Sequence, residues 1–158
     1  MNNRKYKKQI KVKIINKKLQ QYGLPQYATP GSAGMDLYAC IENSVVLQPG
    51  ERKLINTGIA VQIEDSDLAG FVFARSGLAS KRGIALSNGV GLIDSDYTDE
   101  LKVAIVNLSN SPQEINPGDR IAQFVIMPVY AVEWIVSGEL GDTERKGGFG
   151  STGVGNVY

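Results

Sequence analysis

The chain has 158 residues, 42% of them apolar, and a formal net charge of +1, so we expect a single domain with one hydrophobic core. Histidine is absent and Cys40 is the single cysteine, which excludes a Ser/His/Asp triad, a structural zinc site and an internal disulfide. No apolar run could span a membrane, and no signal peptide or G-x-x-x-x-G-K-[ST] phosphate-binding loop is visible. We therefore expect a cytoplasmic protein without a membrane partner.

The N-terminal segment up to Lys18 holds eight of the 17 basic residues and no acidic residue. Such a segment could bind nucleic acid or act as a targeting signal, but its alternating pattern also fits an exposed strand. In that strand the apolar side chains would point inward and the lysines would face water: Ile10, Val12 and Ile14 against Lys11 and Lys13. We favour the strand and expect no nucleic-acid partner.

Short Val/Ile-rich runs separated by turn residues predict an all-β fold. The runs are Val45–Leu47, Leu54–Ile63, Phe71–Ala74, Gly83–Leu86, Leu101–Asn107 and Arg120–Val129. Pro49-Gly50 and Pro117-Gly118 favour type II turns, because proline presets the first central φ and glycine accepts the positive second one. Helical periodicity is weak, and the best candidate is one short turn near Ser76, which could act as its N-cap.

Five separated segments carry most of the chemically informative residues. They are Ala33-Gly-Met-Asp-Leu-Tyr-Ala39, Ala74-Arg-Ser-Gly-Leu-Ala-Ser80, Asn88-Gly-Val-Gly-Leu-Ile-Asp-Ser-Asp-Tyr97, Gly118-Asp-Arg-Ile-Ala-Gln123 and Gly147-Gly-Phe-Gly-Ser-Thr-Gly153. In this order and with this spacing, the segments closely resemble those of the homotrimeric dUTPase family. The resemblance covers residues 33–153, which is most of the chain.

The resemblance implies a distorted jelly roll, assembled as a homotrimer with three active sites at the subunit interfaces. Members of the family hydrolyse dUTP to dUMP and pyrophosphate with magnesium, which limits uracil incorporation into DNA and supplies dUMP for thymidylate synthesis. On this basis we expect a jelly-roll core over residues 1–139 and a flexible C-terminal lid over residues 140–158, within one domain.

The second and fourth segments supply candidate phosphate ligands. An arginine can fork across phosphate oxygens and the amides of a helix start add neutral donors, so Arg75, Ser76 and Gly77 suit a triphosphate. Gln123 lies inside an apolar strand, where a polar amide without further context would face solvent. The resemblance implies instead that Gln123 donates to the α-phosphate, where attack takes place.

The third segment predicts a β-hairpin, because Asn88-Gly89 is a strong tight-turn signal and Gly91 permits close approach of a ligand. Fixed amides and carbonyls there can separate uracil from cytosine, whose hydrogen-bonding edge is partly inverted. The resemblance implies that Tyr97 lies under the deoxyribose and leaves no room for a 2′-hydroxyl, although cross-strand packing is the ordinary role of such a tyrosine. The implied nucleoside-binding residues are Asn88, Gly91, Leu92, Ile93 and Tyr97.

Asp94 is the predicted general base, since a carboxylate can accept a proton from the attacking water and the family places its base at the first aspartate of Asp-Ser-Asp-Tyr. Asp96 and Asp99 are nearby alternatives. Asp36 either bonds local backbone or, as the resemblance implies, acts through water near the magnesium ion. We expect magnesium to be coordinated mainly by phosphate oxygens and water, because it keeps several of its water ligands.

The C-terminal tail is rich in glycine and has little to bury on its own, so we expect it to be mobile unless a ligand or another subunit orders it. The resemblance implies a lid in which Phe149 stacks on uracil, Gly150 and Ser151 contact substrate, and Arg145 reaches the γ-phosphate. This chain is one residue shorter than usual between the arginine and the paired glycines, so Lys146 is an alternative source of the positive charge.

Two other interpretations compete with dUTP hydrolysis. A dCTP deaminase has a similar fold and pocket, but its catalytic glutamate lies three residues before an asparagine in the strand after the hairpin. Here Ala104 occupies that place before Asn107, which argues against deamination. A jelly roll that binds a nucleotide without turnover is the alternative from outside the enzymes.

Overall fold

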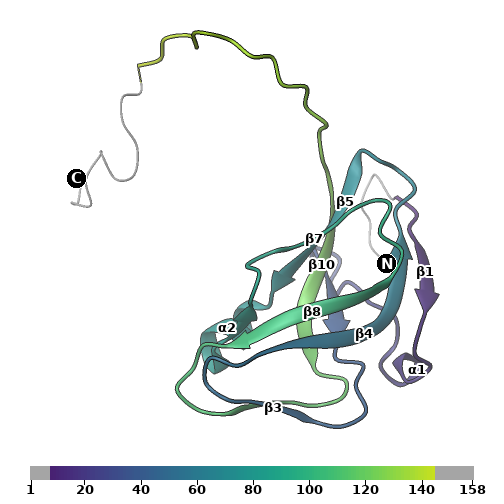
Figure 1. The fold of residues 1–158 in the computed structure, drawn as a ribbon. Coiled ribbons are helices and arrows are strands. Elements are labelled where there is room, and N and C mark those ends of the chain that lie inside the picture. Colours follow the sequence, from purple (N-terminus) through teal and green to yellow (C-terminus); the bar gives the residue numbers. More distant parts are fainter. Residues whose placement is uncertain (1–7, 145–158) are drawn as a thin grey trace.

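Two four-stranded antiparallel sheets form the body of the protein (Figure 1). A computed structural model describes residues 8–144, in which the first sheet has the order β1-β4-β8-β6 and the second the order β2-β10-β5-β7. A further two-stranded sheet pairs β3 with β9. Most neighbouring strands are distant in sequence, as in a jelly roll, and the predicted all-β class is confirmed.

The first sheet contains β1 (Lys11–Ile14), β4 (Arg52–Gln62), β8 (Glu100–Asn107) and β6 (Ile84–Leu86). The second contains β2 (Met35–Tyr38), β10 (Arg120–Pro128), β5 (Leu68–Ala74) and β7 (Gly91–Ile93). The small sheet contains β3 (Val45–Leu47) and β9 (Gln113–Ile115). The described helices are α1 (Leu19–Tyr22) and α2 (Ser76–Arg82). None of the helices in residues 8–144 is both long and apolar enough to cross a membrane.

The core lies between the two large sheets and follows the period-two pattern of their strands. In β8, Leu101, Val103 and Ile105 are at most 1% exposed, whereas Lys102 between them faces outward. The second sheet contributes Leu37, Val72, Ala122 and Phe124 to the same apolar cluster. A single core therefore joins both sheets, as expected for one domain of this size.

The predicted Pro-Gly turns are borne out by the backbone. Gly50 and Gly118 have φ values of 77° and 84°, in the left-handed region that favours glycine. A Cβ at Gly118 would also lie 2.7 Å from Tyr22 Cε1, so this position has no room for a side chain. The second turn leads directly into β10, the strand that begins with Arg120.

The helix predicted near Ser76 is present, but Ser76 is its first residue and not its cap. Arg75 occupies the cap position with extended φ and ψ of −84° and 126°, and no side chain caps the helix. The prediction was wrong about the cap because the chain stays extended for one residue beyond β5. The arginine side chain is thereby presented at the junction of β5 and α2.

The basic N-terminal segment forms a strand, as predicted, at the edge of the first sheet. Its apolar side chains do not point fully inward, since Val12 and Ile14 are each 43% exposed. Three of its lysines are neutralised by acidic side chains of the body: Lys8 by Asp65, Lys11 by Glu64 and Lys18 by Glu42.

An extended arm leaves the body after β10 (Figure 1). The arm carries exposed apolar side chains. All residues from 131 to 140 are exposed, and Trp134 and Val136 are 89% and 98% exposed. The last strand ends at Pro128, so the sheets end before residue 139, where we predicted the end of the core. The division into core and lid at that residue stays a prediction.

Candidate functional site

Asp36 and two arginines form a charged cluster on the second sheet. The buried carboxylate of Asp36 in β2 accepts hydrogen bonds from Arg75 Nε at 2.8 Å and from Arg120 Nη1 at 3.2 Å. Arg75 follows β5 and Arg120 begins β10, and the strand order β2-β10-β5 brings all three together. The predicted phosphate ligand Arg75 therefore lies beside a second arginine for which the sequence suggested no role.

The surroundings of Asp36 argue against the first of the two roles considered for it, that of bonding local backbone. Its carboxylate bonds side chains from two other segments, and in the described residues it makes no bond to local backbone. Within residues 8–144 no three or more Asp, Glu or Cys side chains are grouped so that they could hold a metal ion. This part of the chain thus offers no resident magnesium cage, and the role of Asp36 near magnesium stays a prediction.

Ser76 and Gly77 are exposed at the start of α2, next to Arg75. The first amides of a helix have no acceptor within the helix, so they are available to an anion. Glycine inside a helix costs about 1 kcal/mol relative to alanine. A Cβ built at Gly77 would meet no atom within 4 Å, so a larger residue would fit there. Packing within residues 8–144 therefore does not explain Gly77, and its role in binding a ligand stays a prediction.

Gln123 lies in the middle of β10 and is half-buried. It is directly opposite Asp36 of β2 and Phe73 of β5, so these three side chains share one face of the sheet. The opposite face carries core residues such as Leu37 and Ala122. Gln123 therefore shares the face of the sheet that carries the Asp36 cluster.

The turn predicted at Asn88-Gly89 is present, with φ of 73° at Gly89, but it does not join the two strands of a hairpin. In the described residues β6 pairs with β8 and β7 pairs with β5, so the turn links the two sheets. The hairpin prediction was wrong because Asn-Gly indicates only that the chain reverses locally. The two strands that flank the turn, β6 and β7, each pair with a strand that is more distant in sequence.

A small pocket of about 100 Å³ lies where this turn meets β7 and β8. Its walls come from both sheets: Val72, Leu86, Asn88, Gly91, Leu92, Ile93, Lys102, Val103 and Ala104. Gly91 is needed for packing as well as access, because a Cβ there would lie 3.0 Å from Val72 Cβ. Four of the five predicted nucleoside-binding residues, all except Tyr97, thus line one pocket.

The segment from Asp94 to Tyr97 forms a turn after β7, closed by a 3.1 Å hydrogen bond from the Tyr97 amide to the Asp94 carbonyl. Asp94 is exposed, and in the described residues its carboxylate has no ion-pair or hydrogen-bond partner. The Tyr97 hydroxyl donates to the Glu100 carbonyl oxygen at 3.0 Å. Asp96 and Asp99 are exposed as well, so the structure does not single out one carboxylate of this turn.

The predicted site residues fall into two groups within one chain. The pocket at the Asn88 turn includes none of Arg75, Ser76, Gly77 and Gln123, which gather around the Asp36 cluster. Asp94 and Tyr97 lie in the turn that follows the pocket-lining Ile93. The predicted tail residues Arg145, Phe149, Gly150 and Ser151 lie outside the described residues, as does the alternative Lys146.

Comparison with known proteins places the chain in a family. The family model described as dUTPase matches residues 20–153. The chain belongs to the dUTPase family. A deoxyuridine 5'-triphosphate nucleotidohydrolase of Desulfitobacterium hafniense is 50% identical over 147 residues, covering 92% of this chain and 97% of the relative. Its counterpart from Tolumonas auensis is 49% identical over 148 residues, with coverage of 92% and 98%.

Solved dUTPase structures have the same fold. A dUTPase mutant of Staphylococcus bacteriophage 80alpha with dUpNHpp has a TM-score of 0.82 at 27% identity, covering 94% of this chain and 100% of that one. A second mutant of the same phage enzyme, also with dUpNHpp, has a TM-score of 0.81 with the same identity and coverage.

Within this dUTPase-family chain, sequence reasoning missed two residues that the structure brings to the candidate site. Arg120 lies in the fourth segment with Gln123, but strand alternation alone would put residues three apart on opposite faces, and only the register shift between Arg120 and Ala122 interrupts that alternation. Lys102 lines the small pocket from β8. Its exposed position between buried Leu101 and Val103 follows from strand alternation, but nothing local indicated that β8 meets the Asn88 turn.

Proposed function

We propose that this chain hydrolyses dUTP to dUMP and pyrophosphate in a site that joins the Asn88 pocket to the Asp36 cluster. The observation that carries the proposal is the extent of the dUTPase family match. Residues 20–153 include every residue predicted to touch substrate, from Arg75 to Ser151. The relatives that are about 50% identical are named for this activity, and the match covers nearly their whole length.

Uracil would be recognised by the main chain of β7. In the described residues β7 is an edge strand that pairs only with β5, so its outer amides and carbonyls are unpaired. Such groups offer donors and acceptors at fixed positions, which can match the acceptor-donor-acceptor edge of uracil. Asn88, which lines the pocket, would supply a further amide, and the tight walls of the pocket would exclude the methyl group of thymine.

Asp94 would act as the general base. Its carboxylate takes a proton from a water molecule whose oxygen bonds to the α-phosphorus, while the bond from that phosphorus to the bridging oxygen breaks and pyrophosphate leaves. Gln123 would donate to the α-phosphate, and Arg75 would bind the phosphate chain. The free carboxylate of Asp94 supports this role better than the doubly bonded carboxylate of Asp36 does.

Magnesium would enter as part of the substrate. A triphosphate with its magnesium ion keeps several water ligands and needs few protein ligands. This fits a chain whose described residues contain no acidic cluster that could hold the ion by itself. The metal would neutralise part of the phosphate charge and so help pyrophosphate to leave.

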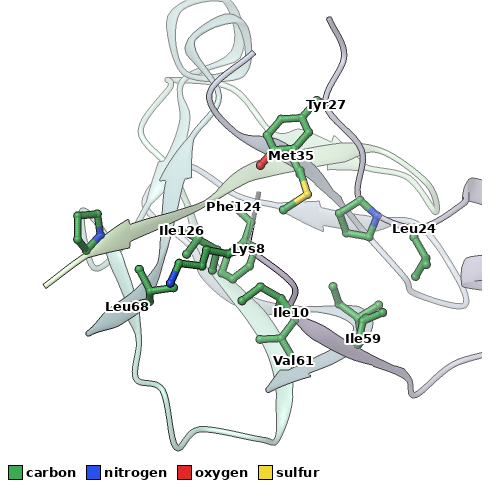
Figure 2. A pocket seen from close by; sticks show the side chains of 13 residues that line it. Lys8, Ile10, Leu24, Tyr27, Met35, Ile59, Val61, Leu68, Phe124 and Ile126 are labelled. Atoms are coloured by element: carbon green, nitrogen blue, oxygen red, sulfur yellow. The ribbon is translucent and has the colours of Figure 1, made fainter. Parts of the chain in front are cut away.

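A homotrimer would complete the site. An apolar groove of about 570 Å³ lies on the body. Figure 2 shows side chains that line it, among them Ile10, Val61, Phe124 and Ile126. The arm after β10 exposes a second apolar surface that includes Trp134 and Val136. Apolar surfaces of this size are usually covered in an assembly, and contacts between copies could also bring the pocket of one chain to the Asp36 cluster of another.

The test is pyrophosphate release from dUTP, dCTP, dTTP and UTP, assayed in parallel with magnesium and with a chelator. We expect release from dUTP alone and only with magnesium, as for an enzyme that works on the cytoplasmic nucleotide pool. Ammonia release from dCTP would favour the deaminase. Binding of dUTP without any product would favour the non-catalytic nucleotide binder.

A further inference from the structure

β4 and β8 lie side by side in the first sheet (Figure 1), but their register shifts near Gly58. From Asn56 to Ala60, β4 advances by four residues, whereas β8 advances by only two between the partners of these residues. Such a bulge leaves main-chain groups without their ladder partners, and bulges are frequent next to active sites, where they redirect a side chain. Only glycine fits at Gly58, because its φ is 76° and a Cβ there would lie 2.6 Å from Cys40 Sγ.

The half-buried side chain of Glu100 replaces a ladder bond that the bulge lacks. The amide of Gly58 donates to Glu100 Oε1 at 2.9 Å, and the Gly58 carbonyl oxygen accepts from the amide of Ile15 at 2.8 Å. A second side-chain bond at the bulge joins Thr57 Oγ1 to the Leu101 carbonyl oxygen at 2.7 Å. Both main-chain polar groups of Gly58 are therefore satisfied, and Glu100 is held by its side chain as well as by the strand ladder.

The main chain of Glu100 in turn anchors the turn that carries Asp94. The Tyr97 hydroxyl donates to the Glu100 carbonyl oxygen at 3.0 Å, and the Tyr97 amide donates to the Asp94 carbonyl oxygen at 3.1 Å. In residues 8–144, this hydroxyl makes the one hydrogen bond that joins a side chain of the largely exposed segment 94–99 to a strand. A continuous series of hydrogen bonds thus leads from the bulge at Gly58 to the turn at Asp94.

We propose that Glu100 is a positioning residue for hydrolysis. Its side chain, bonded to the bulge of β4, fixes the carbonyl oxygen that holds Tyr97, and thereby places the carboxylate of Asp94. The proposal rests on the proposed function, in which Asp94 is the general base. A base has to lie within hydrogen-bond reach of the proton that it takes, and a displacement of about 1 Å can lower a rate roughly 100-fold. Glu100 therefore acts on turnover without having to touch the water or the phosphates.

The first test compares two variants of Glu100 in the full-length protein. Glu100→Gln keeps a carbonyl oxygen that can accept from the Gly58 amide, whereas Glu100→Ala removes the acceptor. We expect Glu100→Ala to lower kcat for dUTP about 10- to 100-fold, while the Kd for dUpNHpp stays within about threefold of the wild-type value. Glu100→Gln should keep kcat within about threefold of the wild type. An unchanged kcat in Glu100→Ala, or a loss of affinity in place of turnover, would overturn the proposal.

Thr57→Val is the matched control for a loss of stability. It removes the other side-chain bond of the bulge, at a residue that is 1% exposed, and leaves the bonds of Glu100 and Tyr97 in place. Its melting temperature should fall as that of Glu100→Ala does, because a buried carbonyl loses its donor. Its kcat, measured well below the melting temperature, should stay within about threefold of the wild type. A loss of turnover as large as that in Glu100→Ala would show general destabilisation and would refute the positioning role.

Tyr97→Phe breaks the same series of bonds at its other end and leaves the bulge intact, so it tests the proposal even if Glu100→Ala does not fold. Its kcat should fall to a similar extent. Because both changes interrupt one series, the double variant should lose little more turnover than either single variant. Additive losses would mean that the two residues act independently and would contradict the proposal.

Hydrogen exchange separates this inference from the proposed function. If the wild-type protein fails to release pyrophosphate from dUTP, the proposed function is wrong. The series of bonds still predicts that the Tyr97 amide, which donates to Asp94, exchanges at least about tenfold faster in Glu100→Ala than in the wild type. Tyr97→Phe should show the same increase at this amide, whereas Glu100→Gln and Thr57→Val should not. Equal exchange in the wild type and all of these variants would refute the inference by itself.

Discussion

The Tyr97 hydroxyl is tied to the main chain of Glu100 by a 3.0 Å hydrogen bond, which holds the ring beside the turn that presents Asp94. If this ring lies under the sugar, Tyr97→Ala should open space for a 2′-hydroxyl. We expect UTP to be accepted and dUTP binding to weaken. The measurement is the ratio of kcat/KM for dUTP to that for UTP, which should fall by at least about tenfold.

Tyr97→Phe is the matched control for the alanine variant. It keeps the ring but removes the hydrogen bond to Glu100, so discrimination against UTP should be largely retained. An unchanged ratio in the alanine variant would mean that Tyr97 only packs against its neighbours.

Asp94→Asn should abolish most of the turnover while substrate affinity is kept. The amide has the shape of the carboxylate but cannot accept the proton of the attacking water, which typically costs about 10²- to 10⁴-fold in rate. Single-turnover pyrophosphate release gives the rate, and equilibrium binding of dUpNHpp gives the affinity.

Asp96→Asn and Asp99→Asn provide the comparison, because both aspartates are exposed near the same turn. Their turnover should stay close to that of the wild type. If Asp94→Asn keeps its turnover within about threefold of the wild type, Asp94 is not the general base. A large loss of turnover in Asp96→Asn or Asp99→Asn would assign the base to that aspartate instead.

Removal of residues 144–158 should lower kcat/KM strongly and leave the assembly folded, if this tail closes over substrate as a lid. Arg145→Ala and Lys146→Ala would then identify the positive charge that meets the γ-phosphate. We expect the larger loss in the arginine variant, because Arg145 keeps the Thr-Glu-Arg context of the family. A large loss only in the lysine variant would reverse the choice, and full activity after deletion would rule out the lid.

If the chain assembles as a homotrimer through the arm after β10, Trp134→Glu should dissociate the assembly without unfolding the body. Trp134 is 89% exposed in the isolated chain, so it does not stabilise the body. A negative charge at this position would therefore destabilise only a contact with another copy. Light scattering should report a smaller mass at unchanged far-UV circular dichroism. Leu108→Glu is the control, since Leu108 is 68% exposed and follows β8 directly, outside the arm. A trimer that survives Trp134→Glu would mean that the arm is not part of the interface.

Cys40 should make stability fall at alkaline pH. Its burial raises the pKa of the thiol, and the carboxylates of Glu100 and Glu42 add to the effect. Because the folded state holds the proton more tightly than the unfolded state, this contribution is complete below the ordinary thiol pKa of 9.0 and is lost as the pH rises above it. Urea unfolding at neutral pH and at pH about 10 should show a smaller alkaline decline in Cys40→Ala than in the wild type. Identical declines would contradict the prediction.

Most strands could be predicted from the sequence because their runs of apolar residues are local. Val45–Leu47 coincides with β3, and the predicted runs for β4, β5, β6, β8 and β10 overlap the observed strands. The runs did not include β2, β7 and β9, which are short and in which Asp36, Gly91 and Glu114 stand among the apolar residues. They are strands because distant partners pair with them, as β5 does with β7.

The candidate site was predictable in its parts and not in its arrangement. The Asn88-Gly89 turn and the short helix near Ser76 followed from residue types and neighbours along the chain, although the residue at the helix cap did not. The bonds that join Asp36 to Arg75 and Arg120 cross 39 and 84 residues of sequence, and no local pattern reports contacts of that range. The same is true of Lys102, which reaches the pocket only because β8 lies next to β6.

The separation of the Asn88 pocket from the Asp36 cluster within one chain has a genetic consequence. If each working site combines the pocket of one copy with the cluster of another, loss-of-function alleles fall into two groups. An allele damaged at Asp94 and an allele damaged at Arg75 would each be inactive alone. Expressed in the same cell, they would form mixed trimers in which an intact pocket meets an intact cluster, so part of the activity would return. Two alleles from the same group would not rescue each other.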